Sequence, residues 1–322
     1  MSGIGTASRS FRHPDTGEPL LLGEGGHLYS HGQVAFESGG GSFDFVTDPH
    51  AREEREHYDA EYSTGGWTTQ QPLDEVDFSS LWRLDVSSRD YLASFGDVAG
   101  KRVLLLGNGT SVKELYFLTQ GADVTFTDLS LEAVNFVRRR FEASKMGVKY
   151  ADKCRFHAVD AMHLPFDDGE FDIVCADAVI HHMDDMHGLM SEIHRCLKPG
   201  GICRFADTAY SPAWQAAKKG ALRALQKKVH GEHGISPEDQ RATDRGGYSL
   251  DEIESIRSSV GFSSLYYKRV ALLDYLLWRA HCNLRIRWIL AFRPLMRGTD
   301  KLLTKIGVMQ THGIALVLGF GK

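Results

Sequence analysis

The chain has 322 residues, of which 42% are hydrophobic and 25% charged, and its formal net charge is −5. These values suit a globular protein with one large domain and additions to it. The acidic balance argues against a general electrostatic attraction to nucleic acid.

The five cysteines form no Cys-x-x-Cys pair, so we expect no metal site and reduced thiols in a cytoplasmic protein. No apolar run reaches the roughly 18 residues of a spanning helix, and the first residues lack the apolar core of a secretory signal.

The first hundred residues divide into two parts. Residues 1–50 are rich in glycine and in short apolar runs, which predicts a small β-rich extension. Residues 51–100 begin with a charged stretch, Ala51–Tyr62, whose pattern indicates a helix leading toward Trp67 and Trp82. We interpret this part as a helical and aromatic lid segment, with a linker helix as the alternative.

Residues 101–206 alternate between short apolar runs and helical patterns. This alternation predicts a parallel, doubly wound α/β sheet with helices on both faces. In one helical pattern the apolar residues from Leu131 to Phe141 fall on one face, and Ser130 is the candidate N-cap. The predicted strands are Val103–Leu106, Val124–Thr127, Phe156–Ala158, Ile173–Ala176 and Ile202–Ala206.

The remainder of the chain has a looser pattern. Residues from about 207 to 311 predict a helical cover, within which Ser249–Glu252 matches a capping box that opens a helix ending near Gly261. Thr311–Phe320 is apolar and predicts a last strand. We therefore expect a domain that spans residues 101–322.

A glycine-rich turn, Gly107-Asn108-Gly109, follows the first strand of this domain. Glycines there let the backbone turn sharply and approach a ligand closely. Ser111 and Glu114 form a second capping-box pattern, which predicts a helix whose N-terminal amides suit an anionic group. A Gly-x-Gly turn alone is also common for structural reasons.

An acidic residue, Asp128, ends the second predicted strand, 19 residues after Gly109. A carboxylate at this position can accept hydrogen bonds from both hydroxyls of a ribose. The dinucleotide fingerprint requires a third glycine where this sequence has Val112, so NAD is disfavoured.

Three later elements complete a recognisable series. Asp160-Ala161 follows the third strand, Phe171–Asp177 leads into His181-His182, and Leu197–Gly201 turns into the fifth strand. In this order and spacing, residues 100–206 closely resemble the class I S-adenosylmethionine (SAM)-dependent methyltransferases, in particular the branch with the ubiquinone/menaquinone C-methyltransferases. The resemblance implies a Rossmann-like, seven-stranded sheet and SAM as the cofactor.

The resemblance also implies roles for individual residues. Gly107 and Gly109 would lie beneath the methionine and ribose portions of SAM, and Asp128 would bind the ribose hydroxyls. Asp160 would accept from the adenine amino group, the Ala161 amide would face the ring, and Asp177 would lie near the methionine. The implied cofactor-binding set is Gly107, Asn108, Gly109, Ser111, Asp128, Leu129, Asp160, Ala161 and Asp177.

Two positions depart from the family pattern. The family usually has an acidic residue where this sequence has Leu105, and a third glycine where it has Ser111. The missing acid removes an expected partner of the SAM ammonium group, so another residue must compensate. The Ser111 hydroxyl can cap the following helix.

Methyl transfer needs positioning of the acceptor and, where the acceptor must lose a proton, a base. His181 and His182 follow the fourth strand and are the candidate catalytic residues, because imidazole titrates near neutral pH. The alternative is that they only pack or hydrogen-bond in that loop.

Three aromatic residues precede the domain: Tyr58, Tyr62 and Trp67. They lie where relatives often fold an aromatic lid over SAM, which makes them candidate substrate or lid residues. Plain hydrophobic packing is the alternative, since aromatic residues at helical spacing usually serve the core.

The N-terminal extension is similar to the small zinc-ribbon-like extension of some bacterial methyltransferases. The likeness rests on Pro14–Leu20, Leu28–Ser30 and Phe43–Phe45. The metal-binding cysteines are absent here, so the resemblance implies a metal-free remnant that serves packing or partner contact.

Residues 269–311 contain eight Lys or Arg and two Asp, a local balance of +6 in a chain of −5. Interleaved aromatic and aliphatic residues make the stretch amphipathic. We expect either contact with an anionic lipid, a phosphorylated substrate or a membrane surface, or a helical cover whose charges face water.

The sequence therefore predicts a SAM-dependent methyltransferase that acts on a small, apolar or lipid-like metabolite. An RNA or protein methyltransferase is one alternative, although the acidic chain disfavours RNA. A catalytically degenerate SAM-fold subunit with a binding or regulatory role is the other, motivated by Leu105 and Ser111.

Overall fold

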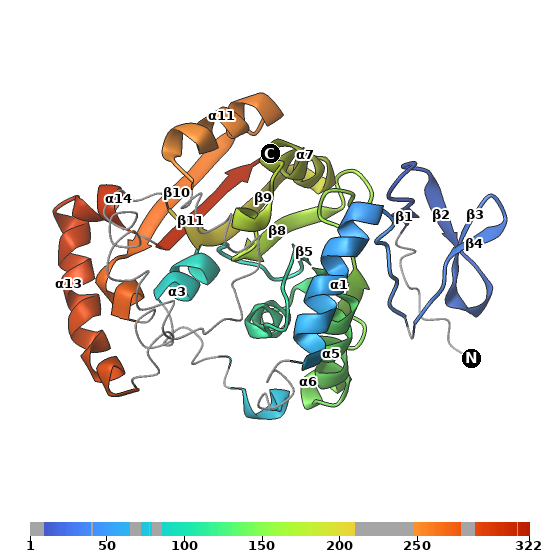
Figure 1. The fold of residues 1–322 in the computed structure, drawn as a ribbon, viewed down its shortest axis with the longest axis horizontal. Coiled ribbons are helices and arrows are strands. Elements are labelled where there is room, and N and C mark those ends of the chain that lie inside the picture. The colour runs from blue at the N-terminus through green and yellow to red at the C-terminus, as the bar shows by residue number, and fades with distance from the viewer. Residues whose placement is uncertain are drawn as a thin grey trace.

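The computed structural model describes residues 10–39, 41–64, 72–76, 78, 86–209, 248–277, 287–313 and 315–322. A seven-stranded mixed sheet flanked by helices forms the body, and a four-stranded antiparallel sheet lies at its N-terminal side (Figure 1). The predicted α/β class, the seven strands and the β-rich extension are confirmed. Trp67, Trp82 and much of the expected helical cover lie outside the described residues.

The central sheet has the strand order β10-β11-β9-β8-β5-β6-β7. Strands β5 to β9 run parallel, and β11 lies antiparallel between β9 and β10. The order reverses between β5 and β8, which is the switch point where open α/β sheets bind ligands. The strands are β5 (Arg102–Leu105), β6 (Asp123–Asp128), β7 (Cys154–Ala158), β8 (Phe171–Asp177), β9 (Leu197–Thr208), β10 (Ser264–Ala271) and β11 (Ala315–Gly321).

Burial on both faces explains the continuous apolar strand β5. Its residues Val103, Leu104 and Leu105 are all fully buried, and successive side chains point to opposite faces. Leu104 packs in one apolar cluster, and Val103 and Leu105 pack in the other. Helices α7 (Met186–Cys196) and α11 (Leu250–Val260) contribute to the first cluster, and α3 (Val86–Ala93) and α5 (Leu131–Glu142) contribute to the second.

The predicted helix signals are confirmed at two places. The Ser130 hydroxyl accepts from the Ala133 amide at 3.1 Å and caps α5. Ser249 and Glu252 form the reciprocal capping box of α11, and Gly261 ends that helix with φ +95°. The remaining helical elements are η1 (Glu24–Gly26), α1 (Pro49–Thr64), η3 (Leu73–Glu75), η4 (Lys113–Leu115), α4 (Tyr116–Thr119), α6 (Lys145–Tyr150), η5 (Ile180–His182), η7 (Arg287–Phe292), α13 (Arg293–Lys305) and α14 (Val308–His312).

Two predictions about the C-terminal part are wrong. The last strand begins at Ala315 rather than Thr311, because Val308–His312 forms the short helix α14. Within the expected helical cover, Ser264–Ala271 is the strand β10. This strand is half-exposed and interleaves tyrosines with Lys268 and Arg269, so its apolar signal is weak.

The N-terminal extension docks against the edge of the central sheet. Its strands are β1 (Phe11–Arg12), β2 (Pro19–Leu22), β3 (Leu28–Ser30) and β4 (Gln33–Phe36). The Phe45 amide donates to the Ala158 carbonyl at 2.8 Å, and the Ala158 amide donates to the Phe43 carbonyl at 2.9 Å. Buried aromatic residues of the extension therefore join one core with the main domain.

Candidate SAM and acceptor site

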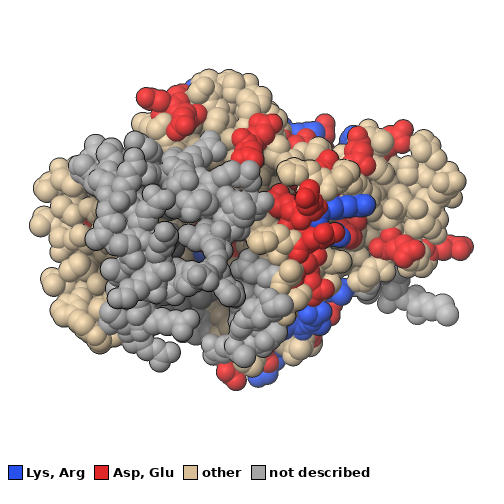
Figure 2. Space-filling model, in the orientation of Figure 1, with Lys and Arg blue, Asp and Glu red and all other residues tan. Residues whose placement is uncertain are grey.

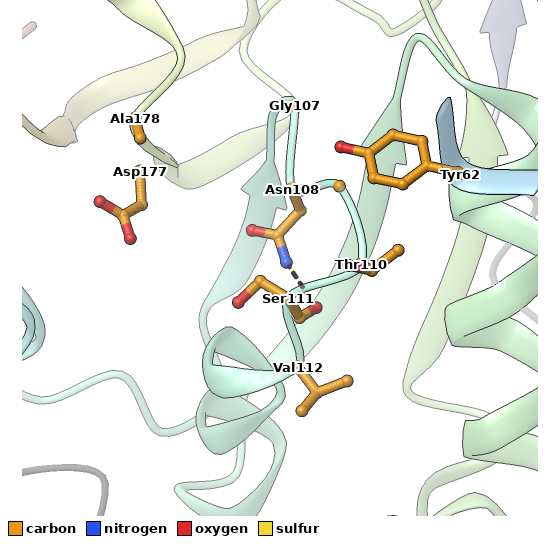
Figure 3. A pocket seen from close by; sticks show the side chains of 9 residues that line it. Tyr62, Gly107, Asn108, Thr110, Ser111, Val112, Asp177 and Ala178 are labelled. Carbon is orange, nitrogen blue, oxygen red and sulfur yellow. Dashed lines mark hydrogen bonds between the residues drawn. The ribbon is translucent and has the colours of Figure 1, made fainter. Parts of the chain in front are cut away.

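A pocket of about 370 Å³ opens at the carboxyl ends of β5 and β8, at the switch point of the sheet (Figure 3). Two segments of the domain and one residue of α1 surround it. The lining residues are Tyr62, Gly107, Asn108, Gly109, Thr110, Ser111, Val112, Asp177 and Ala178. Six residues selected from the sequence thus meet here: Tyr62, Gly107, Asn108, Gly109, Ser111 and Asp177.

Both glycines of the turn are required by its geometry. Gly107 and Gly109 have φ of +57° and +53°, a region that L residues with a side chain rarely adopt. A Cβ at Gly107 would lie 2.7 Å from a methyl group of Val179. A Cβ at Gly109 would lie 2.8 Å from the Tyr62 hydroxyl. The glycines therefore permit close contact of the turn with the loop that follows β8 and with α1.

The capping box predicted for Ser111 and Glu114 is wrong in its geometry. The helical turn η4 has Val112 at its N-cap and no side-chain cap. Instead, the Glu114 carboxylate is buried and accepts from the Ser111 hydroxyl at 3.0 Å and from the Asn108 amide at 3.3 Å. The Ser111–Glu114 spacing therefore marks a buried carboxylate that accepts hydrogen bonds from two side chains of the turn.

A lysine that sequence reasoning missed lies at the pocket. The Lys113 ammonium forms an ion pair with Asp177 and lies 3.7 Å from Oε1 of Glu114. Leu105, by contrast, is fully buried in the apolar core. Among the acidic groups beside the turn, Asp177 and Glu114 are the candidates to compensate for Leu105.

Asp128 supports the turn from the end of β6. Its Oδ2 accepts from the Gly109 amide at 2.6 Å, and its Oδ1 accepts from the Ser130 amide at 2.8 Å. Burial raises the pKa of Asp128 to about 6, against the lowering effect of these two hydrogen bonds. The Asp128 side chain does not line the pocket, but it contacts Gly109, which does. The adjacent Leu129 is partly buried in a small apolar cluster.

Asp160 follows β7, and both of its carboxylate oxygens have partners within three residues along the chain. One oxygen accepts from the Met162 amide at 2.9 Å, and the other lies 2.8 Å from Nδ1 of His163. Burial alone would lower the pKa of His163, but the hydrogen bond and charge of Asp160 raise it. Asp160 and Ala161 do not line the pocket, although the neighbouring Val159 amide donates to the Asp128 carbonyl at 2.9 Å.

His181 is held by a carboxylate that sequence reasoning also missed. Its ring Nδ1 lies 3.0 Å from Oδ1 of Asp207, whose side chain is 1% exposed. Asp207 also accepts from the His181 backbone amide at 3.2 Å. The His182 ring lies 4.1 Å from the His181 ring, measured between centroids. Both histidines follow β8 at the ligand edge of the sheet, outside the pocket lining.

A third missed feature is the backbone of Ala178, which lines the pocket with φ +59°. A non-glycine residue in this region is uncommon and marks local strain of the kind stored at functional sites. The Ala178 amide donates to the Ala206 carbonyl at 2.8 Å, which fixes the strained turn.

Of the predicted lid residues, Tyr62 lines the pocket, Tyr58 does not, and Trp67 lies outside the described residues. Asp59 attaches helix α1 to the N-terminal end of α5. This carboxylate accepts from the Ser130 hydroxyl and, at 3.1 Å, from the Glu132 amide at the start of α5. α1 thereby brings Tyr62 to the turn.

These features fit an adenosyl sulfonium. A volume of about 370 Å³ falls within the usual range of small-molecule pockets, roughly 300–1,000 Å³. The glycine turn lines this pocket together with Asp177, whose carboxylate is paired with the Lys113 ammonium.

The fold and this site define the class. Residues 104–205 match the family model described as "Methyltransferase domain". The chain is 30% identical over 155 residues to an uncharacterised methyltransferase of Synechocystis sp., covering 46% of this chain and 68% of that protein. The chain belongs to the class I SAM-dependent methyltransferases.

Among named relatives, the demethylmenaquinone methyltransferase of Clavibacter sepedonicus is 32% identical over 129 residues, which cover 39% of this chain and 48% of that protein. The chain spans about half to two thirds of the length of the curated relatives that it matches first. Geranyl diphosphate C-methyltransferase from Streptomyces coelicolor shares the fold, with a TM-score of 0.53 at 14% identity over 85% of this chain and 98% of that structure.

The likeness of the N-terminal extension to a zinc ribbon gains no support, because the family match is confined to residues 104–205. Within the described residues, no group of three or more His, Cys, Asp or Glu is placed to hold a metal ion.

Proposed function

We propose that this protein is an enzyme that transfers a methyl group from SAM to a small, apolar or lipid-like acceptor. The observation that carries the proposal is the glycine turn at the switch point, which shares one pocket with Asp177 and Tyr62; His181, paired with Asp207, follows Asp177 in the loop after β8. The name of the menaquinone-pathway relative supports an apolar small-molecule acceptor.

The residues that would hold SAM come from the ends of four parallel strands. Gly107, Asn108, Gly109 and Ser111 would lie along its methionine and ribose portions. Asp128 would accept from the ribose hydroxyls, and Leu129, Asp160 and Ala161 would contact the adenine side. Asp177, with its partner Lys113, would face the charged groups of the methionine.

When bound, SAM supplies a methyl group that is already activated by a positively charged sulfur. The protein's task is then to orient the acceptor and to take its proton. An ionised carboxylate only accepts hydrogen bonds, so Asp207 keeps the proton of His181 on Nδ1 and the lone pair on Nε2. His181 would accept the acceptor's proton at Nε2, and Asp207 would stabilise the imidazolium that forms.

This arrangement suits an acceptor that must lose a proton, such as a hydroxyl group or an acidic carbon. His181 is favoured over His182 because the buried carboxylate orients its ring. The buried free thiols of Cys154, Cys175, Cys196 and Cys203 support a reducing compartment, and we propose the cytoplasm.

Two measurements test the proposal. Titration calorimetry with S-adenosylhomocysteine should give saturable heat, and its absence would favour a degenerate binding subunit. Tritiated SAM, incubated with cell extract, should then label the organic-solvent fraction. Label confined to RNA or to protein would identify one of the other two methyltransferase classes instead.

A further inference from the structure

Helix α13 stands at the end of the molecule opposite the N-terminal sheet (Figure 1). Together with the preceding turn η7 and its own C-cap residue Ile306, it carries half of the large apolar side chains that are exposed among the described residues. We name these five residues the outer stripe: Trp288 (69% exposed), Phe292 (48%), Leu295 (62%), Leu302 (57%) and Ile306 (64%). Figure 2 shows that edge almost wholly as uncharged atoms.

The polar face of α13 points into the protein. Asp300 is buried and accepts from the Leu273 and Asp274 amides, each at 3.0 Å. Asp274 is buried too, and it accepts two hydrogen bonds from the Arg293 guanidinium, at 2.8 and 2.9 Å, and one from Arg297 at 3.2 Å. Arg293, Arg297 and Asp300 are spaced four and three residues apart, so they share one face of the helix.

The apolar face therefore points outward. Leu295, Leu302 and Ile306 are spaced seven and four residues apart, which places them on a single face as well. Leu295 follows Arg293 by two residues, about 200° around a helix of 3.6 residues per turn, so this face is opposite the buried polar one. A surface helix normally buries its apolar side, and the reverse orientation here leaves an apolar stripe open to a further partner.

The charges beside the outer stripe restrict what that partner is. Residues 287–313 contain five Lys or Arg and a single acid, Asp300, which is buried. Arg293 and Arg297 are both paired with Asp274, while Lys301 and Lys305 are exposed beside the stripe. A second copy of this chain would bring like charges together, whereas an anionic surface complements them.

We propose that the outer stripe binds the surface of an anionic lipid bilayer. Helices that lie at a bilayer interface insert apolar side chains, often with a tryptophan among them, and carry lysines along the flank. No helix in the described part of the chain is long and apolar enough to cross a bilayer, so α13 would lie on the membrane rather than span it.

The test is co-sedimentation of the full chain with vesicles of phosphatidylglycerol and phosphatidylcholine, and with vesicles of phosphatidylcholine alone. The chain should sediment with the anionic vesicles, and the triple variant Leu295→Gln/Leu302→Gln/Ile306→Gln should bind them at least about tenfold more weakly. Lys301→Glu/Lys305→Glu, which leaves the apolar residues in place, should weaken binding to the anionic vesicles selectively.

A matched control changes three exposed apolar residues elsewhere: Leu21→Gln/Leu22→Gln/Val148→Gln. It should bind like the unaltered chain. Failure of the unaltered chain to sediment with anionic vesicles overturns the proposal, and so does a triple variant that binds as well as the control. A dimer by light scattering that the stripe variant alone abolishes, without vesicle binding, would assign the stripe to self-association.

Discussion

The ring of His181 is oriented by a buried carboxylate, since its Nδ1 lies 3.0 Å from Oδ1 of Asp207. The two residues lie at the ends of neighbouring parallel strands: His181 follows β8, and Asp207 is near the end of β9. Because Asp207 also accepts from the His181 amide, the carboxylate fixes both the ring and the loop that carries it. We therefore regard Asp207 as a positioning residue for His181.

The first prediction concerns this pair. Asp207→Asn keeps the shape of the side chain but removes the charge that stabilises a protonated imidazole. We therefore expect kcat to fall by about 10²-fold, and the apparent pKa on the acidic limb of the pH–kcat profile to fall as well. His181→Ala should lower kcat by a similar or larger factor. Both variants should bind S-adenosylhomocysteine as tightly as the unaltered protein, as measured by calorimetry.

His182→Ala is the matched control, because its ring lies next to that of His181, 4.1 Å away between centroids, but is not paired with Asp207 in the same way. A loss of kcat for His182→Ala as large as that for His181→Ala would contradict the assignment. An Asp207→Asn variant with weaker nucleotide binding and an unchanged pH profile would indicate a purely structural role.

The second prediction follows from the buried Asp128, whose pKa is raised to about 6. Donation by ribose hydroxyls and a nearby positive charge favour the carboxylate, so binding of SAM should release a proton. Affinity should rise as the pH increases through about 6 and level off above about 7. Since the folded pKa exceeds that of the unfolded chain, near 4, the ligand-free fold loses stability through this group as the pH rises from about 4 to about 6.

Calorimetry in buffers of different ionisation enthalpy measures the proton release directly. Asp128→Asn should remove the pH step and weaken binding at pH 7.5 by at least about tenfold. Asp123→Asn, at the other end of β6, is the control and should leave both unchanged. An Asp128→Asn variant with the unaltered pH dependence would show that another group titrates.

The third prediction concerns Gly107. Gly107→Ala should destabilise the fold and weaken SAM binding, because its φ of +57° is unfavourable for alanine and the new Cβ would lie 2.7 Å from Val179. Gly100→Ala has a similar φ of +70° but no atom within 4 Å of the new Cβ. It should show only the conformational cost, about 1–2 kcal/mol.

The free energies of unfolding of these variants, measured by urea denaturation, separate the steric cost from the conformational cost. If steric overlap with Val179 is responsible for the difference, Val179→Ala should restore part of the stability of Gly107→Ala. Equal destabilisation by the two glycine substitutions would mean that the turn can relax away from Val179.

The sequence predicts those features that depend on neighbours along the chain. The helix caps at Ser130 and Ser249 are of this kind, since a cap and its amide are three residues apart. The sequence also predicts the glycine turn, because a strand running into Gly-x-Gly is a local pattern.

What the sequence does not predict depends on pairing between distant segments. Asp207 meets His181 across 26 residues because two strands are adjacent in the sheet. The strain at Ala178 carries no sequence signal, because alanine is rare at positive φ. The Ser111–Glu114 spacing gave the correct partners but the wrong geometry, since the carboxylate binds side chains of the turn instead of a helix amide.

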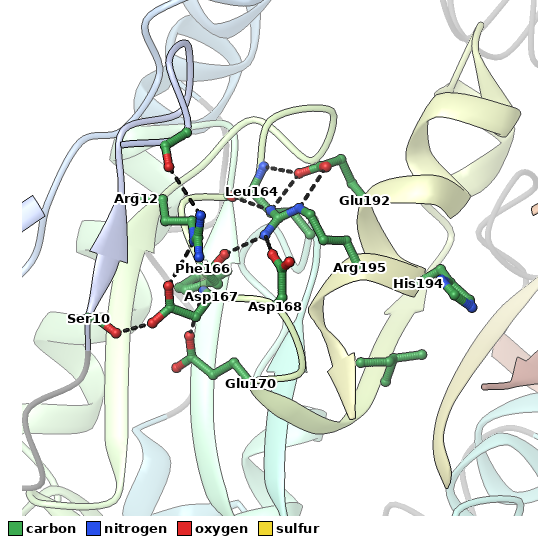
Figure 4. Close-up of polar contacts among 12 residues, drawn as sticks. Ser10, Arg12, Leu164, Phe166, Asp167, Asp168, Glu170, Glu192, His194 and Arg195 are labelled. Carbon is green, nitrogen blue, oxygen red and sulfur yellow. Dashed lines mark hydrogen bonds and ion pairs between the residues drawn. The ribbon is translucent and has the colours of Figure 1, made fainter. Parts of the chain in front are cut away.

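The last prediction concerns Arg195 on α7, which organises the loop where the N-terminal extension docks (Figure 4). Its guanidinium donates to the Phe166 and Leu164 carbonyls at 2.7 and 2.8 Å and forms two hydrogen bonds with Glu192. Hydrogen bonding to Glu192 raises the pKa of Arg195, so it stays charged. The Arg12 amide of β1 then donates to the Pro165 carbonyl of the same loop at 3.0 Å.

Arg195→Lys cannot reproduce this planar set of bonds, so we expect the free energy of unfolding to fall by about 2 kcal/mol. Residues 10–48 should become more sensitive to limited proteolysis, because the loop that receives β1 loses its support. Arg257→Lys on α11, an arginine of similar exposure that also binds a glutamate and a carbonyl, is the control and should leave the proteolysis of residues 10–48 unchanged. Unaltered proteolysis of Arg195→Lys would show that the aromatic core around Phe11 holds the extension without the loop.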